Sequence, residues 1–159
     1  MKPKVLLVDD DQSVLGVIQS ALSHSGYEIA TASTAAEMWE SIRAQTPDVI
    51  VLDMRLPDAN GLELVGKIKQ LHTEVEIVML TGFGTVESAV EAIKAGAFHF
   101  ATKPIQLESL ELLIQRAAEH KQLSSRVEAL QQAVSTLSGG VAPIFRSPAM
   151  RNLLRVVSR

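Results

Sequence analysis

The sequence predicts a doubly wound α/β domain with a parallel sheet and a helical extension at its carboxyl end. The prediction rests on short apolar runs that alternate with stretches of helical periodicity over roughly residues 1–120. Uninterrupted apolar runs of this length are typical of parallel strands that are buried on both faces. Four of the runs also end at a polar residue, namely Asp9, Asp53, Thr81 or Lys103. Ligands of open α/β sheets bind where the strands end, so these side chains mark one candidate site.

Glycine, proline and capping residues separate the predicted elements. Gly26 and Gly96 stop the first and fourth helices, while Thr34 is suited to cap the second helix and Pro47 ends that region. A turn-rich loop at residues 57–61 separates the third strand from the third helix. The predicted strands are residues 5–8, 27–32, 49–52, 77–80 and 98–102, and the helices between them are residues 13–24, 35–42, 62–71 and 86–95.

The fifth helix is predicted to run beyond the domain, because no proline or glycine occurs in residues 107–137. A helix of about 30 residues is roughly 45 Å long. Its first part can pack on the sheet, and its second part has apolar residues at the four-three spacing of a two-stranded coiled coil. An amphipathic helix folded back on its own domain is the alternative. The predicted seam of the coiled coil consists of Leu123, Val127, Leu130, Val134 and Leu137.

The composition excludes several classes of protein. The formal net charge is −3, so there is no overall basic excess for nucleic-acid binding by this chain. Cysteine is absent, which excludes disulfides, thiol chemistry and thiolate metal sites. The first apolar run is too short for a signal peptide, and no run approaches the roughly 20 residues that span a bilayer. We therefore expect a cytoplasmic protein with no membrane partner.

Three acids are expected to converge where the first and third strands end. Like charges held close together raise each other's pKa unless a cation joins them. Mg²⁺ prefers oxygen ligands and commonly takes one or two carboxylates with water and phosphate oxygens. Helix capping by Asp10 or Asp11 is the simpler explanation, but it accounts for one acid and not for Asp9 and Asp53 as well. The pattern therefore indicates a magnesium site.

Lys103 and Thr81 complete a candidate site for a phosphoryl group. Each has a plain alternative, since a lysine near acids can be a simple ion pair and a threonine can be a turn residue. Together, Lys103 and the metal would neutralise phosphoryl oxygens, Thr81 would donate a hydrogen bond, and a carboxylate would attack phosphorus. A cis bond before Pro104 would aim the lysine back into the site.

The strand-end motifs together resemble the receiver domain of two-component response regulators. The resemblance covers roughly residues 3–120 and implies a flavodoxin-like sheet with strand order 2-1-3-4-5. It implies that Asp53 accepts a phosphoryl group from a phosphohistidine on a sensor histidine kinase. It also implies no enzymatic activity beyond the chain's own phosphorylation and dephosphorylation. The motifs are Val8-Asp9-Asp10-Asp11, Leu52-Asp53-Met54-Arg55-Leu56-Pro57-Asp58-Ala59-Asn60-Gly61, Leu80-Thr81-Gly82 and Thr102-Lys103-Pro104.

The resemblance implies a set of magnesium ligands. Asp10 and Asp53 would bind the ion directly, Arg55 would bind it through its backbone carbonyl oxygen, and Asp9 would bind it through water. Asp11 matches no acid that the family requires, so we expect it to cap the first helix.

The resemblance also implies a switch. Asp53, Thr81 and Lys103 match the reactive residues of the family, in which the hydroxyl group swings toward the aspartyl phosphate. An aromatic residue on the fifth strand moves inward with it, and here that residue is Phe100. Many relatives have tyrosine at this position, so Phe100 keeps the ring and lacks the hydroxyl group. A simple core role for Phe100 is the alternative.

Further motifs resemble the subgroup of regulators that activates sigma-54 RNA polymerase. These are the Thr81-Gly82-Phe83-Gly84-Thr85-Val86 stretch, the long fifth helix and Arg146-Ser147-Pro148-Ala149-Met150, which opens a AAA+ ATPase domain in that subgroup. No Walker A motif and no helix-turn-helix is visible. We predict a phosphoacceptor receiver domain at 1–120, a coiled-coil linker helix at 121–138, and a linker with the start of a truncated AAA+ domain at 139–159. A homodimer would form through the linker helix, and sigma-54 RNA polymerase and DNA would be reached only through downstream domains.

Three other functions stay open. A haloacid-dehalogenase-type phosphatase also has an Asp-x-Asp after its first strand, but it needs a later acidic pair, and no acid follows Leu80 until Glu87. A stand-alone phosphorelay receiver without an output domain would carry the same motifs. A flavodoxin-like cofactor binder fits least, because acids at the first loop repel a flavin phosphate. Turnover of many phosphate esters would favour the phosphatase over the receiver.

Overall fold

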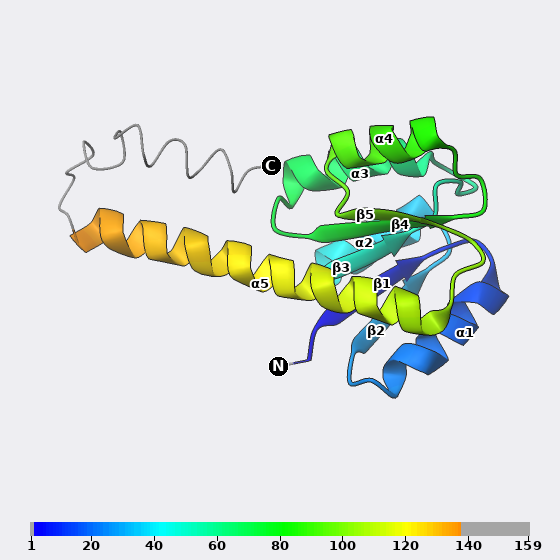
Figure 1. The fold of residues 1–159 in the computed structure, drawn as a ribbon, viewed down its shortest axis with the longest axis horizontal. Coiled ribbons are helices and arrows are strands. Elements are labelled where there is room, and N and C mark those ends of the chain that lie inside the picture. The colour runs from blue at the N-terminus through cyan, green and yellow to red at the C-terminus, as the bar shows by residue number, and fades with distance from the viewer. Residues whose placement is uncertain (1, 138–159) are drawn as a thin grey trace. The chain divides into compact units, whose positions relative to one another are not determined.

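The computed structural model describes residues 2–137 and contains one parallel sheet in this range, with helices on both faces (Figure 1). The strand order is β2-β1-β3-β4-β5, which confirms the predicted fold class and the order that the resemblance implied. The strands are β1 (Lys4–Val8), β2 (Glu28–Ala32), β3 (Val49–Leu52), β4 (Glu76–Thr81) and β5 (His99–Thr102). The helices are α1 (Gln12–Ser23), α2 (Ala35–Ala44), α3 (Gly61–Leu71), α4 (Val86–Ala95) and α5 (Leu107–Leu137).

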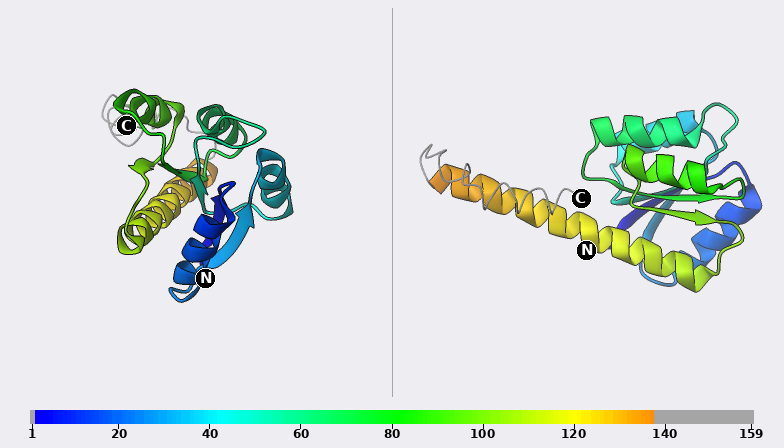
Figure 2. Two further views of the ribbon diagram at one scale, coloured as in Figure 1. Left: turned by 90° about the vertical axis from the view of Figure 1, so that its right-hand side faces the viewer. Right: turned by 45° about the horizontal axis from the view of Figure 1, so that its top comes forward.

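The central strands direct alternate side chains into two separate cores. Leu6 and Ile50 lie in the core that contains the buried residues of α2, α3 and α4. Leu7 and Val51 lie in the core that contains those of α1 and the first part of α5. Figure 2 shows these two groups of helices on opposite faces of the sheet. Because successive strand residues point to opposite faces, only uninterrupted apolar runs can fill both cores.

Local capping explains where several helices begin and end. Thr34 is the N-cap of α2, and its hydroxyl oxygen accepts a hydrogen bond from the backbone N–H of Glu37 at 3.1 Å. Thr85 caps α4 with a reciprocal hydrogen-bond pair to Ser88. Gly96 ends α4 with φ of 117°, a left-handed conformation that favours glycine. The predicted roles of Thr34 and Gly96 are therefore confirmed.

The edge strand β5 differs from the prediction of strands buried on both faces. His99 and Thr102 are exposed, and Phe100 and Ala101 are only partly buried. By contrast, every residue of β3 and β4 is buried. The prediction is wrong for β5 because, within residues 2–137, this strand pairs with β4 alone and has no neighbour on its other side.

Helix α5 is continuous from Leu107 to Leu137, as the absence of glycine and proline predicted. The chain divides into two compact units after Gln122, and α5 contributes Leu110 and Ile114 to the core of the first unit. The described part of the second unit is helical and exposes the side chains of Leu123, Val127, Leu130 and Val134. Pairing of two such helices stays a prediction, and the side chain of Leu137 and the predicted segment at 139–159 lie outside the described part. Within residues 2–137, no helix is long and apolar enough to cross a membrane.

Candidate functional site

Three carboxylates meet at the carboxyl edge of the sheet. Asp9 directly follows β1 and Asp53 directly follows β3, and the parallel register that pairs Val8 with Leu52 sets the two acids next to each other. The strand ladder continues into the site, because the N–H of Asp53 donates to the carbonyl oxygen of Val8 at 2.9 Å. Asp10 adds an exposed carboxylate, and one oxygen atom of each acid lies within 4.8 Å of the other two. The structure thus brings together the three acids that the sequence analysis singled out.

Lys103 is the cation of this cluster. Its backbone N–H donates to the carbonyl oxygen of Thr81 at 2.9 Å, and the peptide bond to Pro104 is cis. Its Nζ atom donates to Oδ2 of Asp9 and lies 3.6 Å from Oδ2 of Asp53. Burial opposes the charge on Lys103, but the hydrogen bond to Asp9 and the charge of Asp53 leave its pKa above the usual value. One ammonium group is therefore shared between two carboxylates.

The carboxylate of Asp53 is buried and incompletely paired. Asp53 is 6% exposed, and its Oδ1 atom accepts no hydrogen bond within the described residues. Burial raises the pKa of Asp53, while the positive charge of Lys103 opposes this rise and the negative charge of Asp9 adds to it. A buried oxygen without a partner costs stability, and a cation or ligand bound to Oδ1 would remove that cost.

The oxygen atoms of the cluster fit a hard divalent cation such as Mg²⁺. Both oxygens of Asp9 already have partners, since Oδ1 accepts the N–H of Asp11 at 2.9 Å and Oδ2 accepts from Lys103. The oxygens open to an ion belong to the exposed Asp10 and to Oδ1 of Asp53. Two carboxylates that leave room for water and phosphate oxygens are a usual set of ligands for Mg²⁺.

Asp11 has a structural role at the start of α1. Its Oδ1 atom accepts hydrogen bonds from the Ser13 hydroxyl at 2.5 Å and from the backbone N–H of Ser13 at 3.0 Å. The Ser13 hydroxyl is the main cause that lowers the pKa of Asp11. The prediction that Asp11 caps the first helix is confirmed.

The two predicted switch residues both contact the loop between β4 and α4. Thr81 is fully buried, and its Oγ1 accepts a hydrogen bond from the backbone N–H of Phe83 at 3.2 Å. Phe100 is partly buried against the core under α2, α3 and α4. A side chain on Gly84 would have no room, because its Cβ would lie 2.8 Å from the ring of Phe100. The loop is therefore tied to Thr81 by a hydrogen bond and packs closely against the ring of Phe100.

The loop between β3 and α3 is shaped by contacts that the sequence analysis missed. The carboxylate of Asp58 accepts hydrogen bonds from the N–H groups of Ala35 at 2.8 Å and Ala36 at 3.0 Å, which fixes the loop to the start of α2 and lowers the pKa of Asp58. Where the loop returns to β3, a Cβ on Gly61 would lie 2.7 Å from Cα of Met54. The turn composition signals this loop, but no local pattern signals partners 22 and 23 residues away.

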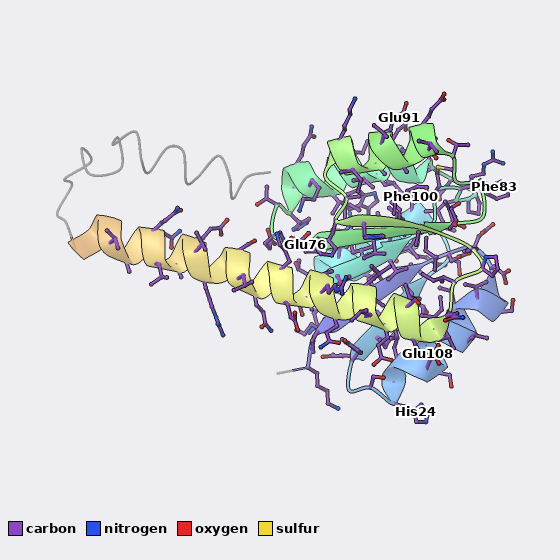
Figure 3. The ribbon with its side chains drawn as sticks, in the orientation of Figure 1. His24, Glu76, Phe83, Glu91, Phe100 and Glu108 are labelled. Carbon is purple, nitrogen blue, oxygen red and sulfur yellow. The ribbon has the colours of Figure 1, made fainter. Side chains whose placement is uncertain are left out.

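A second missed contact joins the loops after β3 and β4. The guanidinium carbon of Arg55 lies 4.0 Å from the ring centroid of Phe83, a stacked cation–π arrangement. Figure 3 shows Phe83 at the carboxyl edge of the sheet. The sequence analysis assigned a role only to the backbone carbonyl group of Arg55.

An apolar groove of about 540 Å³ opens beside Lys103 between α1 and the start of α5. Val14, Val17 and Ile105 contribute to its lining, and Val17 is 57% exposed. The charged cluster is thus flanked by an apolar surface that a partner can contact.

Residues 5–115 match the family described as the response regulator receiver domain. The match runs from the second residue of β1 into α5, and so includes each strand-end residue of the cluster described above.

Individual relatives agree with this family match. The transcriptional regulator NtrC of Escherichia coli K12 is 33% identical over 156 residues, which are 98% of this chain and 32% of NtrC. The chain thus spans about a third of the length of the relatives it matches. NtrX of Brucella abortus superposes with a TM-score of 0.77 and 34% identity over 82% of this chain and 30% of that chain. A beryllofluoride-activated receiver-domain dimer of NtrC4 superposes with a TM-score of 0.71 and 36% identity over 74% of this chain and 98% of that chain.

Proposed function

The chain belongs to the response regulator receiver domain family, and from this premise we propose that Asp53 accepts a phosphoryl group from a phosphohistidine of a sensor histidine kinase. In this proposal the phosphorylated domain regulates a longer sigma-54-dependent activator, of which this chain is the regulatory part. The chain would catalyse only its own phosphorylation and dephosphorylation.

The observation that carries the proposal is the free Oδ1 atom of Asp53. It is the buried side-chain oxygen in residues 2–137 that has no hydrogen-bond partner, and it belongs to a carboxylate beside a lysine. In the proposed reaction a bond forms between the Asp53 carboxylate and phosphorus while the bond from phosphorus to the donor imidazole nitrogen breaks. The nucleophile must be ionised, and the ammonium group of Lys103 favours that form in a buried site.

Neighbouring residues would stabilise the charge that develops on the phosphoryl oxygens. Lys103 supplies a positive charge at the position between Asp9 and Asp53. The Thr81 hydroxyl accepts from Phe83 and so retains its own hydrogen atom to donate. Asp10, Asp53 and the Arg55 carbonyl group would hold Mg²⁺ directly, and Asp9 would hold it through water. The bound ion would neutralise negative charge on the phosphoryl oxygens. The occupied oxygens of Asp9 support this division between direct and water-mediated ligands.

The apolar groove between α1 and α5 is the surface on which we propose that the kinase docks. It adjoins Lys103, so a helix seated on Val14 and Val17 would bring a phosphohistidine close to Asp53. The half-exposed Val17 would be covered in such a complex, which would contribute to binding through apolar burial.

The proposed output is a change in how two chains pair. A phosphoryl group on Asp53 would draw the Thr81 hydroxyl, and Phe100 would follow because the same loop contacts both residues. These shifts lie at the surface of α4, β5 and α5, and α5 continues into the exposed leucine seam. The NtrC4 receiver forms a dimer when activated with beryllofluoride, which supports pairing as the output. The phosphoryl group would thus shift the population between two arrangements.

Substitution of the acceptor tests the proposed reaction. Asp53→Asn should abolish labelling by acetyl phosphate, whereas Asp48→Asn at the opposite edge of the sheet should keep a single equivalent of acid-labile phosphate per chain. Labelling that survives in Asp53→Asn would place the reaction elsewhere, and continuing turnover of phosphate esters would favour a phosphatase.

Substitution in the seam tests the proposed pairing. Leu130→Asp should shift the protein toward monomer in analytical ultracentrifugation, because a buried charge in an apolar seam is costly. The matched control is Gln131→Asp, which places the same charge one residue off the seam. Equal effects of the two substitutions, or a dimer that Leu130→Asp leaves intact, would move the interface elsewhere.

A further inference from the structure

The contact between Arg55 and Phe83 is the feature of the carboxyl edge that the proposed reaction does not use. It joins two loops that both leave the site, since Arg55 lies two residues after Asp53 and Phe83 lies two residues after Thr81. Phe83 is 55% exposed, so much of its surface is not covered by the rest of the protein. In the described residues the guanidinium group of Arg55 supplies the cation over this ring.

Arg55 has no acidic partner although it adjoins a cluster of acids. No ion pair of Arg55 with any carboxylate occurs within residues 2–137, while Lys103 contacts both Asp9 and Asp53. The backbone N–H of Arg55 lies against the Asp53 carboxylate and lowers the pKa of that group. The backbone of Arg55 therefore lies beside the acceptor, while its guanidinium group rests on an aromatic ring.

Phe83 is connected to both residues of the proposed switch. Its backbone N–H donates to Oγ1 of Thr81 at 3.2 Å. The next residue, Gly84, packs so closely that an added Cβ would lie 2.7 Å from Thr102 and 2.8 Å from Phe100. A contact that fixes the Phe83 ring therefore also restrains the β4–α4 loop. This loop would have to move when Thr81 and Phe100 reorient.

Resting on the proposed function, we propose that Arg55 is a positioning residue that exchanges partners when Asp53 is phosphorylated. In the unmodified protein its guanidinium group sits on the Phe83 ring and holds the β4–α4 loop in the resting position. A dianionic phosphoryl group on Asp53 provides a stronger partner, because the planar guanidinium group can donate two parallel hydrogen bonds to phosphoryl oxygens. The arginine then leaves the ring and the loop is released.

This exchange predicts effects of opposite sign for the two contacting residues. Phe83→Leu removes the resting partner of Arg55, so beryllofluoride with Mg²⁺, which mimics the phosphoryl group, should bind about two- to fivefold more tightly. Arg55→Gln removes the partner of the phosphoryl group, so the same probe should bind about tenfold more weakly. If the contact served only to stiffen the site, both substitutions would change the affinity in the same direction.

A double-mutant cycle tests the proposal on the full 159-residue chain. In the Arg55→Gln background, Phe83→Leu should leave beryllofluoride affinity unchanged, because the arginine is no longer there to be released. Affinity for Mg²⁺ alone is measured in every variant, so that a change in metal binding is separated from a change in beryllofluoride binding. Val86→Ala, an exposed change on the same segment, is the matched control and should not alter either affinity. Arg55→Lys, which keeps the charge and loses the planar fork, provides a second variant and should weaken binding less than Arg55→Gln.

The outcomes separate the two proposals. Tighter binding in Phe83→Leu and weaker binding in Arg55→Gln would support the exchange. Changes of the same sign, or equal effects of Phe83→Leu in both backgrounds, would overturn it while leaving phosphorylation of Asp53 intact. Absence of beryllofluoride binding to the unsubstituted protein would overturn the proposed function and the exchange together.

Discussion

The two edges of the central sheet carry the same kinds of charged residue and use them differently. At the amino edge, the buried Glu76 accepts from the ring of His120 at 2.8 Å, and Asp48 accepts from Lys121 Nζ at 2.5 Å and from the backbone N–H of Lys4 at 2.8 Å. At the carboxyl edge three acids gather, Lys103 pairs with only two of them, Asp9 and Asp53, and Oδ1 of Asp53 has no hydrogen-bond partner within the described residues. Figure 3 shows Glu76 and Phe83 at the two ends of the sheet.

The ion pairs at the amino edge stabilise the fold, whereas the incompletely paired acids at the carboxyl edge form a ligand-binding site. At the amino edge each acid has a partner of its own on the last receiver turns of α5, which fastens that helix to the starts of β3 and β4. At the carboxyl edge the excess of negative charge is unfavourable until a cation arrives. Substitutions at the amino edge should therefore alter stability, and substitutions at the carboxyl edge should alter chemistry.

Exchange of the lysine at each edge should give the largest contrast. Lys103→Met should slow phosphorylation by acetyl phosphate by about a hundredfold, because it removes a preorganised charge at the reacting oxygens. Lys121→Met should leave that rate within about twofold and lower the free energy of unfolding by about 1 kcal/mol. The rate is measured from incorporated phosphate and the stability by urea unfolding. Similar phosphorylation rates for the two variants would contradict the proposal that only the carboxyl edge takes part in the reaction.

Two neighbouring acids at the carboxyl edge, Asp10 and Asp11, should differ in their contribution to Mg²⁺ binding. Asp10→Ala should weaken Mg²⁺ binding by about tenfold or more, since even residues outside the first coordination shell commonly contribute that much. Asp11→Ala should leave Mg²⁺ affinity unchanged and cost about 1 kcal/mol of stability through the lost cap of α1. Titration calorimetry and thermal unfolding measure the two effects. Equal losses of Mg²⁺ affinity in the two variants would mean that the roles of metal ligand and helix cap are wrongly assigned to Asp10 and Asp11.

Neutralising one acid at each edge should shift stability in opposite directions in metal-free buffer. Asp53→Asn should raise the free energy of unfolding by about 1 kcal/mol at neutral pH, because burial disfavours the ionised carboxylate. Glu76→Gln should lower it by about 1 to 2 kcal/mol, because a buried acid loses its charged hydrogen bond to His120. Chemical unfolding in the presence of a chelator measures both changes, and shifts of the same sign would contradict the comparison.

The pH dependence of the Asp53→Asn effect follows from the direction of the pKa shift. The pKa of Asp53 is higher in the folded protein than the ordinary value of 3.8, so ionisation destabilises the fold at pH values above the raised pKa. The advantage of the asparagine variant should therefore be full at neutral pH and disappear as the pH falls through the raised pKa toward 3.8. An advantage that grows on acidification would have the wrong sign.

The sequence predicted the carboxyl edge far better than the amino edge. Asp9, Asp53, Thr81 and Lys103 each follow or end a recognisable apolar run, and parallel strands necessarily bring such positions to one edge. The amino-edge pairs join residues 44 and 73 positions apart, and they depend on how far α5 extends over the sheet, which no local pattern encodes. The contacts of Asp58 with α2 and of Arg55 with Phe83 were missed for the same reason, since each joins separate loops. The exposure of β5 was missed because periodicity does not reveal which strand lies at the edge.

Mass spectrometry of trapped phosphoprotein tests the central claim most directly. Borohydride reduces an aspartyl phosphate to homoserine, which marks the modified residue in a peptide digest. After treatment with acetyl phosphate and Mg²⁺, we expect homoserine at position 53 and unmodified aspartate at positions 9, 10, 11, 48 and 58. Homoserine at another of these positions, or none after treatment with any phosphoryl donor, would contradict the account.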